Sequence, residues 1–395
     1  MIEYTGKYGK AKVMIDELDE TTISQIYEFL NHEAFTNPIA IMPDTHAGKG
    51  AVIGFTMKMT DKVIPNVVGV DIGCGMLSLS TGQDIFQDLR REVLDKAIRE
   101  IIPFGTSVRE EPMLNHLNKK TFELFSMEHQ LFTTFYNTRY GTRYSPATFN
   151  EEWLKEKCKQ IEIDYGRTLS SIGTLGGGNH FIEIGKSEKT NKYWITIHCG
   201  SRQFGLKVAN YWQKKAGKGA LAYLQGDDMF GYLTDMLFAQ RYADINRRTI
   251  ATLILNYLLS IEEDDYISTV HNFIDFHDFI IRKGAISSYE SQRMIIPFNM
   301  EDGILICMGK SNPEWNYSAP HGAGRVSSRS KAKENLKVIE EDIKNRMTIE
   351  KNIYSSKIPL DEVKEAYKDP KIIEDSIDPT ATIVDRIKPV LSMKD

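Results

Sequence analysis

The sequence is poor in cysteine, and the four cysteines that it contains are not spaced in pairs. Cys74, Cys158, Cys199 and Cys307 are scattered over 395 residues. Such spacing argues against a disulfide framework and fits a reducing compartment. We therefore expect a cytoplasmic protein without structural disulfides.

Long apolar runs and an N-terminal leader are also missing. The longest apolar stretch, near Ile250 to Leu259, is too short and too interrupted to span a bilayer. Residues Met1 to Tyr4 lack the basic and then apolar order of a signal peptide. We expect no membrane partner.

Charge of one sign does not dominate the chain. The formal net charge is −5, with 26% charged and 41% hydrophobic residues, which is the balance of an ordinary globular protein with a substantial core. This charge neither attracts nor excludes nucleic acid. A polyanion would therefore need a local basic cleft.

Strand-like and helix-like segments occur in blocks and do not alternate regularly, which predicts the α+β class. We find no internal repeat and no linker, so we expect one domain over residues 1–395. This domain should have a central sheet or sandwich core flanked by helices. Its helices should include an insertion at about 206–265 and a C-terminal helical segment at about 330–395.

One turn carries a carboxylate and a thiol three residues apart, Asp71 and Cys74. Gly73 and Gly75 allow the backbone to turn tightly enough to aim both side chains at one point. Asp offers a hard oxygen, and a deprotonated Cys offers a sulfur that can bridge two cations. A strand that ends in an Asx turn with a buried structural cysteine would have the same local pattern.

Histidines elsewhere favour the metal interpretation of this turn. Three of them stand where a strand-like segment meets a turn: His180, His198 and His271. A lone histidine of this kind is more often a hydrogen-bonded core residue. Together with Asp71 and Cys74, however, they supply the five ligands that two cations sharing a thiolate need, with positions left open for substrate. Mn²⁺, Zn²⁺, Fe²⁺ and Co²⁺ all suit these donors, and His277 is a reserve ligand.

His321 stands in a different setting, the segment His-Gly-Ala-Gly-Arg that ends at Arg325. Its glycines allow backbone N–H groups to turn toward an anion, and the arginine can fork onto phosphate oxygens. This setting suits a nucleophile that accepts a phosphoryl or nucleotidyl group. A glycine-rich turn with a structural histidine is the alternative. Further phosphate-friendly groups are Gly176 to Asn179, Arg202 and Arg329, and none of them forms a P-loop or a dinucleotide fingerprint.

Six motifs, taken in order, resemble the RtcB family of GTP-dependent RNA ligases, and the likeness runs from about Pro43 to Lys394. They are Pro-Asp-Thr-His-Ala-Gly-Lys-Gly at 43–50, Val-Gly-Val-Asp-Ile-Gly-Cys-Gly-Met at 68–76, Gly-Gly-Gly-Asn-His-Phe-Ile-Glu-Ile at 176–184, His-Cys-Gly-Ser-Arg at 198–202, His-Asn at 271–272 and His-Gly-Ala-Gly-Arg at 321–325. The resemblance implies an RtcB-like fold. It also implies an enzyme with two Mn²⁺ ions that joins RNA ending in a 2′,3′-cyclic phosphate or 3′-phosphate to RNA beginning with a 5′-hydroxyl.

The resemblance also implies a role for each matching residue. Cys74 would bridge the two ions, with Asp71 and His180 at one site and His198 and His271 at the other. His321 would carry the guanylate, and Arg202 would face RNA phosphate. The remaining implied contacts to GTP come from Asn179, Glu183, Gly322, Ala323, Gly324, Arg325, Tyr367 and Lys394. Implied partners are GTP, RNA with broken or spliced ends and an archease-like activating protein.

The chain departs from the family pattern near the expected guanine site. Residues 298–303 read Phe-Asn-Met-Glu-Asp-Gly where the family usually has Gly-Ser-Met-Gly, and 311–319 also diverges. The chain is short for the family and ends Lys394-Asp395 where Lys-Gly is usual. These differences bear on GTP selectivity and on the choice between tRNA splicing and RNA repair.

Two other classes of function are open at this stage. One is a metal-dependent RNA phosphodiesterase or cyclic phosphatase that lacks guanylyl transfer, and the other is an RNA-binding protein without catalysis. Asn179, His321 and Lys394 argue for the ligase, because a hydrolase needs no guanylate carrier.

Overall fold

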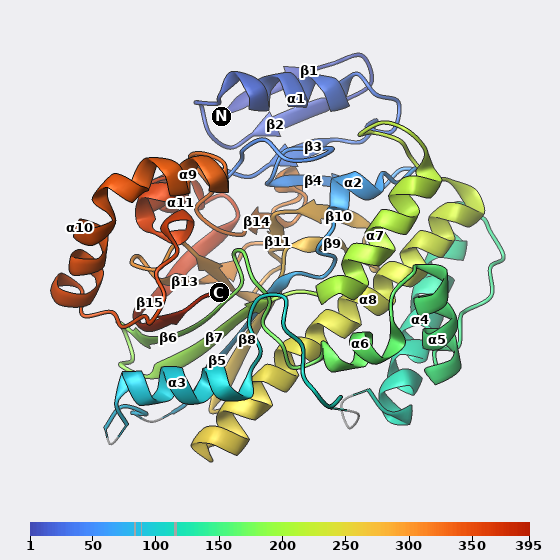
Figure 1. Ribbon diagram of the computed structural model, residues 1–395. Helices are drawn as coiled ribbons and strands as arrows, with labels where there is room; N and C mark the ends of the chain where they lie inside the picture. Colours follow the sequence, from blue (N-terminus) through green and yellow to red (C-terminus); the bar gives the residue numbers. More distant parts are fainter. Residues whose placement is uncertain (83, 88, 114–116) are drawn as a thin grey trace.

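The structure is a computed structural model of residues 1–395, and it describes all of them except 83, 88 and 114–116. Strands form the centre and helices lie outside them (Figure 1). The predicted α+β class, with a β core flanked by helices, is confirmed.

The larger sheet has seven strands in the described residues, and each neighbouring pair is antiparallel. In spatial order the strands are β12 (Arg293–Pro297), β13 (Ile304–Gly309), β15 (Ala381–Met393), β6 (Phe181–Ser187), β7 (Tyr193–Cys199), β5 (Gly75–Ser80) and β8 (Asp265–Val270). Its two edge strands, β12 and β8, also contact each other, so the sheet nearly closes on itself.

Strands β5, β6 and β7 lie at the centre of this sheet and are buried on both faces. β7 is buried along its whole length, as its sequence Tyr-Trp-Ile-Thr-Ile-His-Cys suggests, because both faces are covered. Ile195 and Ile197 pack on one side with side chains of α3 (Arg91–Ile101) and α8 (Gly226–Thr252). Trp194 packs on the inner side with residues of β8, β12 and β13.

A second sheet of six strands lies toward the N-terminal end. Its order is β1 (Ile2–Thr5), β2 (Lys10–Val13), β3 (Ile39–Ile41), β4 (Phe55–Lys58), β10 (Ile280–Lys283) and β9 (Asn272–Ile274), and a separate pair joins β11 (Ala285–Ser287) to β14 (Ser318–Pro320). Helix α1 (Glu20–Leu30) packs on this sheet through Ile26, Phe29 and Leu30. Asp19 caps α1 by accepting a hydrogen bond from the backbone N–H of Thr22.

Most of the remaining helices gather in two places. One group stands at the right of Figure 1, and the other forms a lobe at the left with α11 beside it. The first group comprises α4 (Lys119–Tyr140), α5 (Glu151–Gln160), α6 (Tyr165–Ser170), α7 (Arg202–Ala216) and α8. The second comprises α9 (Arg329–Leu336), α10 (Glu340–Asn345) and α11 (Pro370–Ser376). The short helix α2 (Pro65–Val68) lies near β10. Helix α8 continues as a π-helical turn, Leu253–Leu259.

The expectation that the chain is helical from about 330 to 395 is wrong in its last part. Helical turns end at Ser376, and β15 then runs for 13 residues between β13 and β6. The segment Ala-Thr-Ile-Val at its start and Val-Leu-Ser-Met at its end suit a strand, whereas the charged residues between them obscure the alternation. This strand carries Lys394 to the centre of the molecule.

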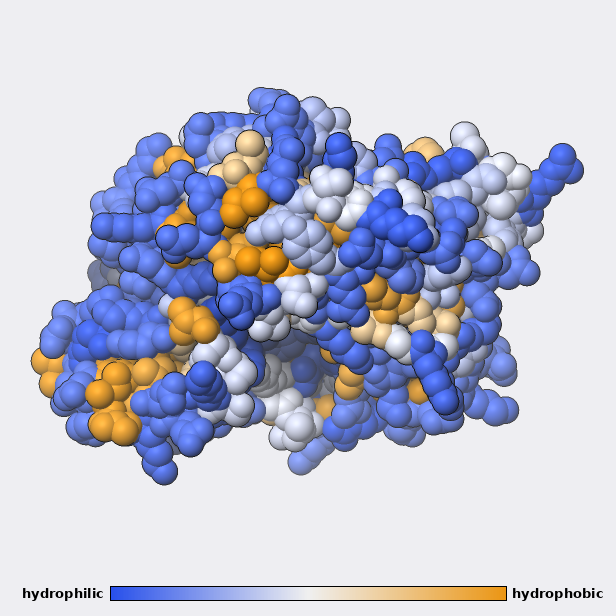
Figure 2. Space-filling model, turned by 90° about the horizontal axis from the view of Figure 1, so that it is seen from above, coloured by the Kyte–Doolittle hydropathy of each residue, from blue (hydrophilic) through white to orange (hydrophobic). Residues whose placement is uncertain are grey.

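Among the described residues, no helix is both long and apolar enough to cross a bilayer. Seen from the α1 end, the surface is mostly hydrophilic, with apolar side chains in separate patches (Figure 2). A hollow in this view separates the lobe of α9 and α10 from the rest of the molecule.

Candidate metal centre and nucleotide cavity

The register of four adjacent strands brings the five predicted ligands to one end of the larger sheet. Gly75, the first residue of β5, pairs with Cys199 on one side and Val270 on the other. Cys74 therefore lies beside the ends of β7 and β8, which present His198 and His271. His180 directly precedes β6, whose first residue pairs with His198.

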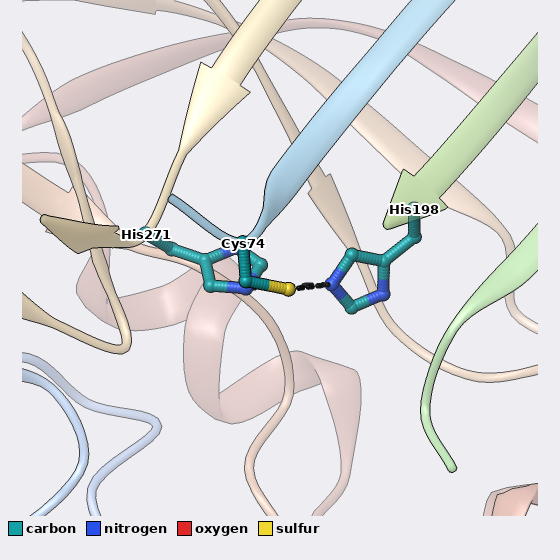
Figure 3. Close-up of side chains that lie close together, drawn as sticks. All are labelled: Cys74, His198 and His271. Carbon is teal, nitrogen blue, oxygen red and sulfur yellow. Dashed lines mark hydrogen bonds between the residues drawn. The ribbon is translucent and has the colours of Figure 1, made fainter. Parts of the chain in front are cut away.

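These five side chains form two groups that share the sulfur of Cys74. Cys74, His198 and His271 make one group, and Asp71, Cys74 and His180 make the other; within each group the potential ligand atoms lie within 4.8 Å of one another. Cys74 Sγ lies 3.2 Å from His198 Nε2 and 3.5 Å from His180 Nε2. Figure 3 shows the first group, with both imidazoles converging on the sulfur.

The imidazoles are oriented as metal ligands. The Nδ1 atoms of His180 and His198 each donate to a backbone carbonyl, those of Leu175 and Asn179, at 3.1 Å. This leaves their Nε2 lone pairs directed at the centre, which is the arrangement by which outer hydrogen bonds orient metal ligands. His198 Nε2 and His271 Nε2 face each other at 3.3 Å.

The electrostatics of the cluster also fit divalent cations. Burial, with the neighbouring imidazoles, holds the pKa of both His198 and His271 well below the ordinary value, so both rings are neutral and can donate electron pairs. Burial and the Asp71 charge raise the pKa of the Cys74 thiol. Burial acts to raise the pKa of Asp71, but the neighbouring His180 and the charge of Arg202 outweigh it and lower this pKa. A cation bound here would stabilise the thiolate that this environment otherwise disfavours.

Two features of the surrounding chain hold the ligand loops in place. Gly200 leaves room for the Asp71 carboxylate, since a Cβ at this position would lie 2.0 Å from Asp71 Oδ1. On α8, the buried Arg247 donates from one nitrogen to the carbonyls of Gly73 and Cys199, at 2.8 and 2.7 Å. The loops before β5 and after β7 are therefore tied to a single helix.

His321 lies next to the metal cluster and is oriented by a carboxylate. Its ring centroid is 4.8 Å from that of His271. Its Nδ1 lies 2.5 Å from Oδ2 of Asp44, a fully buried residue whose carboxylate also accepts from the His321 backbone N–H. Gly324, at φ +77, allows the two loops to pack, because a Cβ there would lie 2.4 Å from the Asp44 carbonyl. With its proton at Nδ1, His321 has a free electron pair on Nε2.

One cavity contains His321, most of the predicted ligands and the residues expected to contact GTP. Its lining includes Asp71, Cys74, Asn179, Glu183, His198, His271, the segment 321–325, Tyr367 and Lys394. Lys394 reaches this cavity because Met393 at the end of β15 pairs with Ile182 of β6. The divergent segment, Phe298 to Met300 and Gly303, lines the same cavity.

Glu183 is a buried carboxyl with an unpaired oxygen in this cavity. It is 4% exposed, and its Oε1 has no hydrogen-bond partner in the described part of the chain. Burial raises the pKa of Glu183 to about 8, although the charge of Lys394 acts in the opposite direction. An unpaired acceptor aimed into a cavity is the group expected where a ligand supplies the donor.

We expect Glu183→Gln to change how the stability of the nucleotide-free protein depends on pH. The folded-state pKa lies above the ordinary value of 4.5, so the folded protein holds more protons than the unfolded chain between these two values. The contribution of Glu183 to the free energy of unfolding is present below pH 4.5 and is lost as the pH rises toward 8. This loss amounts to no more than about 1.4 kcal/mol per pH unit. Urea unfolding across this range should show the loss in the wild type and a flatter profile in the variant; parallel profiles would contradict a raised pKa.

Arg325 and Arg329 already form hydrogen bonds and ion pairs with groups of the protein in this structure. Arg325 donates to the Glu362 carboxylate, to the Tyr367 hydroxyl at 2.9 Å and to the Asp361 carbonyl at 2.7 Å. Arg329 is paired with the carboxylates of Asp361 and Glu362. A phosphate bound by these arginines would therefore compete with Asp361 and Glu362 for their charge.

Arg202 lies in a second cavity on the other side of the ligands. This cavity is lined by Asp71, His180, Arg167, Arg202 and the glycine pair Gly177 and Gly178, among others. The Arg202 guanidinium donates to the Gly105 carbonyl at 2.9 Å and to Thr174 Oγ1 at 3.0 Å. Asp71 borders both cavities, so they meet at the cluster.

The structure excludes His277 from the cluster and adds two carboxylates that the sequence analysis did not assign. His277 lies exposed in a turn after β9, with its ring against Phe135. Asp44 belongs to the motif at 43–50 that contributes to the family resemblance, so the sequence did mark its position. Nothing nearby in the sequence marks Glu362.

A mixed α+β fold that gathers sulfur, imidazole and carboxylate side chains at one cavity has the features expected of a metal-dependent enzyme. Comparison with known proteins identifies the family. Residues 25–395 match the family described as tRNA-splicing ligase RtcB, and the chain belongs to this family.

Individual relatives agree with this assignment. The chain is 31% identical to RNA-splicing ligase RtcB of Escherichia coli (strain K12) over 377 residues, which cover 84% of this chain and 83% of the relative. It is 26% identical to the tRNA-splicing ligase RtcB of Archaeoglobus fulgidus, covering 83% and 81% of the two chains. The Nanoarchaeum equitans protein of the same name is also 26% identical, covering 98% and 94%.

Proposed function

We propose that this protein is a GTP-dependent RNA ligase. It would join RNA ends that carry a 2′,3′-cyclic phosphate or 3′-phosphate to RNA ends that carry a 5′-hydroxyl, in RNA repair or tRNA splicing. The observation that carries the proposal is the Asp44-oriented His321, whose ring adjoins a cluster of two metal-ligand groups within one cavity. The test is whether GTP labelled at the α-phosphate transfers its label to the protein.

Guanylyl transfer to the protein would use the free electron pair of His321 Nε2. This atom attacks the α-phosphorus of GTP, a P–N bond forms, and the bond from phosphorus to the bridging oxygen of the β-phosphate breaks to release pyrophosphate. Asp44 holds the proton at Nδ1 and stabilises the charge that develops on the ring.

Two further transfers complete the reaction. A 3′-phosphate oxygen of the RNA attacks the guanylate, which breaks the P–N bond and restores His321. The 5′-hydroxyl oxygen of the second RNA then attacks the activated 3′ phosphorus, and GMP leaves. A cyclic phosphate must first be opened by hydrolysis to the 3′-phosphate.

The ligand groups suit two divalent cations, which we propose to be Mn²⁺. Asp71, Cys74 and His180 would hold one, and Cys74, His198 and His271 the other. When bound, such cations withdraw charge from phosphoryl oxygens. The RNA 3′ end would enter through the second cavity, where Arg202 lies close to Asp71 and His180.

GTP would bind in the first cavity. Guanine presents both an acceptor, O6, and amino donors. Lys394 supplies a donor and Glu183 an unpaired acceptor at the same end of the sheet. Asn179 lines the cavity beside the cluster and would contact phosphate, as would the backbone of Gly322, Ala323 and Gly324. An archease-like activator and a cytoplasmic location stay predictions from the sequence.

We expect Asp44→Asn to slow guanylylation on the order of 10²-fold, within the usual range for a group that supports proton placement on a catalytic histidine. An amide can donate to Nδ1, which would move the proton to Nε2 and remove the nucleophilic electron pair. Single-turnover labelling by GTP measures the effect, and binding of GTP should change much less. Unchanged labelling kinetics would show that Asp44 only supports the loop.

A further inference from the structure

Glu362 is a buried carboxylate that bonds four side chains at the wall of the nucleotide cavity. It is 1% exposed. Its oxygens accept from Lys394 Nζ at 2.5 Å, from Arg329 at 2.6 Å, from the Tyr367 hydroxyl at 2.8 Å and from Arg325. One carboxylate therefore ties together four groups from three separate parts of the chain.

This network faces the cavity. Glu362, Tyr367, Arg325 and Lys394 all line it, as does Glu183. Apart from Glu362, Lys394 Nζ has two weaker contacts among the described residues, the Asn179 carbonyl at 3.5 Å and the face of the Phe181 ring, 5.1 Å from its centroid. The position of this ammonium group in the cavity thus depends mainly on Glu362.

Glu362 is surrounded by positive charge before any ligand binds, because Lys394, Arg325 and Arg329 all pair with it. Burial opposes ionisation of Glu362, but Lys394, Arg325 and Arg329 together lower its pKa to about 2, so it is an anion throughout the neutral range. Asp361 is a second carboxylate in this network and pairs with Arg329 at 3.0 Å. The guanidinium of Arg325 lies 4.7 Å from the centroid of the Tyr367 ring. Arg325 therefore contacts the face of this ring, while Glu362 accepts a hydrogen bond from its hydroxyl.

We propose that Glu362 is a positioning residue for the base of the bound nucleotide, an inference that rests on the function proposed above. It holds the Lys394 donor and the Tyr367 ring in place around the cavity before GTP arrives. Binding then costs less ordering of long side chains. Because adenine carries an amino donor where guanine carries O6, a fixed ammonium beside the Glu183 acceptor favours guanine.

The test substitutes Glu362→Gln and measures guanylylation of the metal-loaded protein over a range of GTP concentrations. The amide has the same shape but no charge, and its NH₂ group repels Lys394. We expect KM for GTP to rise about tenfold or more, the size of a charge-assisted hydrogen bond. The maximal rate should fall by no more than about threefold, because His321 and the cluster are untouched. The preference for GTP over ATP should shrink with the rise in KM.

Asp235→Asn is the matched control. Asp235 is likewise a buried carboxylate, paired with Lys157 and accepting from Trp212 Nε1 at 2.8 Å, but it does not line the cavity. The Asp235→Asn variant should leave KM for GTP unchanged. Should Glu362→Gln fold poorly, Tyr367→Phe removes only the hydroxyl bonds to Glu362 and Arg325, and it should raise KM a few-fold.

The outcomes separate this inference from the proposed function. A labelled wild type together with unchanged KM and unchanged GTP preference in Glu362→Gln would overturn the inference alone, as would equal KM effects in Asp235→Asn. A wild type that takes no label from GTP would overturn the proposed function and the inference with it. If Glu362 acts through Lys394, the rise in KM in the double variant should be smaller than the product of the rises in Glu362→Gln and Lys394→Met. A rise equal to that product would show that Glu362 does not act through Lys394.

Discussion

His321→Ala is expected to abolish transfer of label from α-labelled GTP to the protein. The substitution removes the only nucleophilic atom that the proposal places on the guanylate, and neighbouring imidazoles cannot replace it because His198 and His271 point their Nε2 atoms at the cluster. In the wild type the label should be acid-labile, as a P–N bond is, and it should depend on added Mn²⁺. Gel autoradiography after a fixed incubation measures both.

His277→Ala is the matched control for this experiment. His277 is an exposed histidine that packs on Phe135 away from the cluster, so its loss should leave labelling intact. Label that persists in His321→Ala would show that another residue is the nucleophile. A wild type that takes up no label but hydrolyses cyclic phosphate RNA ends would favour the phosphodiesterase alternative over the ligase.

The second large effect is expected from Cys74→Ala, which should lower bound Mn²⁺ from two equivalents to none. The sulfur belongs to both ligand groups, so its removal leaves His198 with His271 on one side and Asp71 with His180 on the other. Two ligands hold a divalent cation weakly compared with three. Elemental analysis after dialysis against a fixed concentration of Mn²⁺ gives the number of ions per chain.

Cys158→Ala provides the comparison, because this buried cysteine on α5 contacts Thr168 and lies outside the cluster. It should retain both ions. Retention of one ion by Cys74→Ala would assign the sulfur to a single site, and retention of two would remove it from the centre. Since burial raises the pKa of the free thiol, Mn²⁺ binding by the wild type should release protons and weaken as the pH falls.

Sequence and structure agree on chemistry more closely than on architecture. The residues singled out for metal binding carry their donor types in the sequence itself, and glycines such as Gly200 mark places where another side chain must approach closely. By contrast, the sequence pattern predicts a helix where β15 lies, because charged residues interrupt its alternation and its partners β13 and β6 lie far away in the chain. Local pattern is weak information for a strand whose burial is decided by distant neighbours.

The supporting residues show the same limit. Asp44 and Arg247 act through contacts with residues more than 170 positions away, His321 and Gly73 respectively. The motif at 43–50 marks the position of Asp44, but no local pattern shows which distant residue Asp44 or Arg247 contacts. Glu362 is the clearest case, because three cations converge on it only in the folded chain.

The sequence by itself determined the family, the α+β class and the side chains that are candidate metal ligands, because these depend on residue types and on the order of short motifs. The tertiary structure alone decided how the donors are grouped, which carboxylate orients His321 and how Lys394 reaches the cavity. The physical reason is strand register: pairing of Gly75 with Cys199 and Val270 lines up the ends of strands that lie up to about 200 residues apart. Register is set by packing across the whole sheet, and no single strand encodes it.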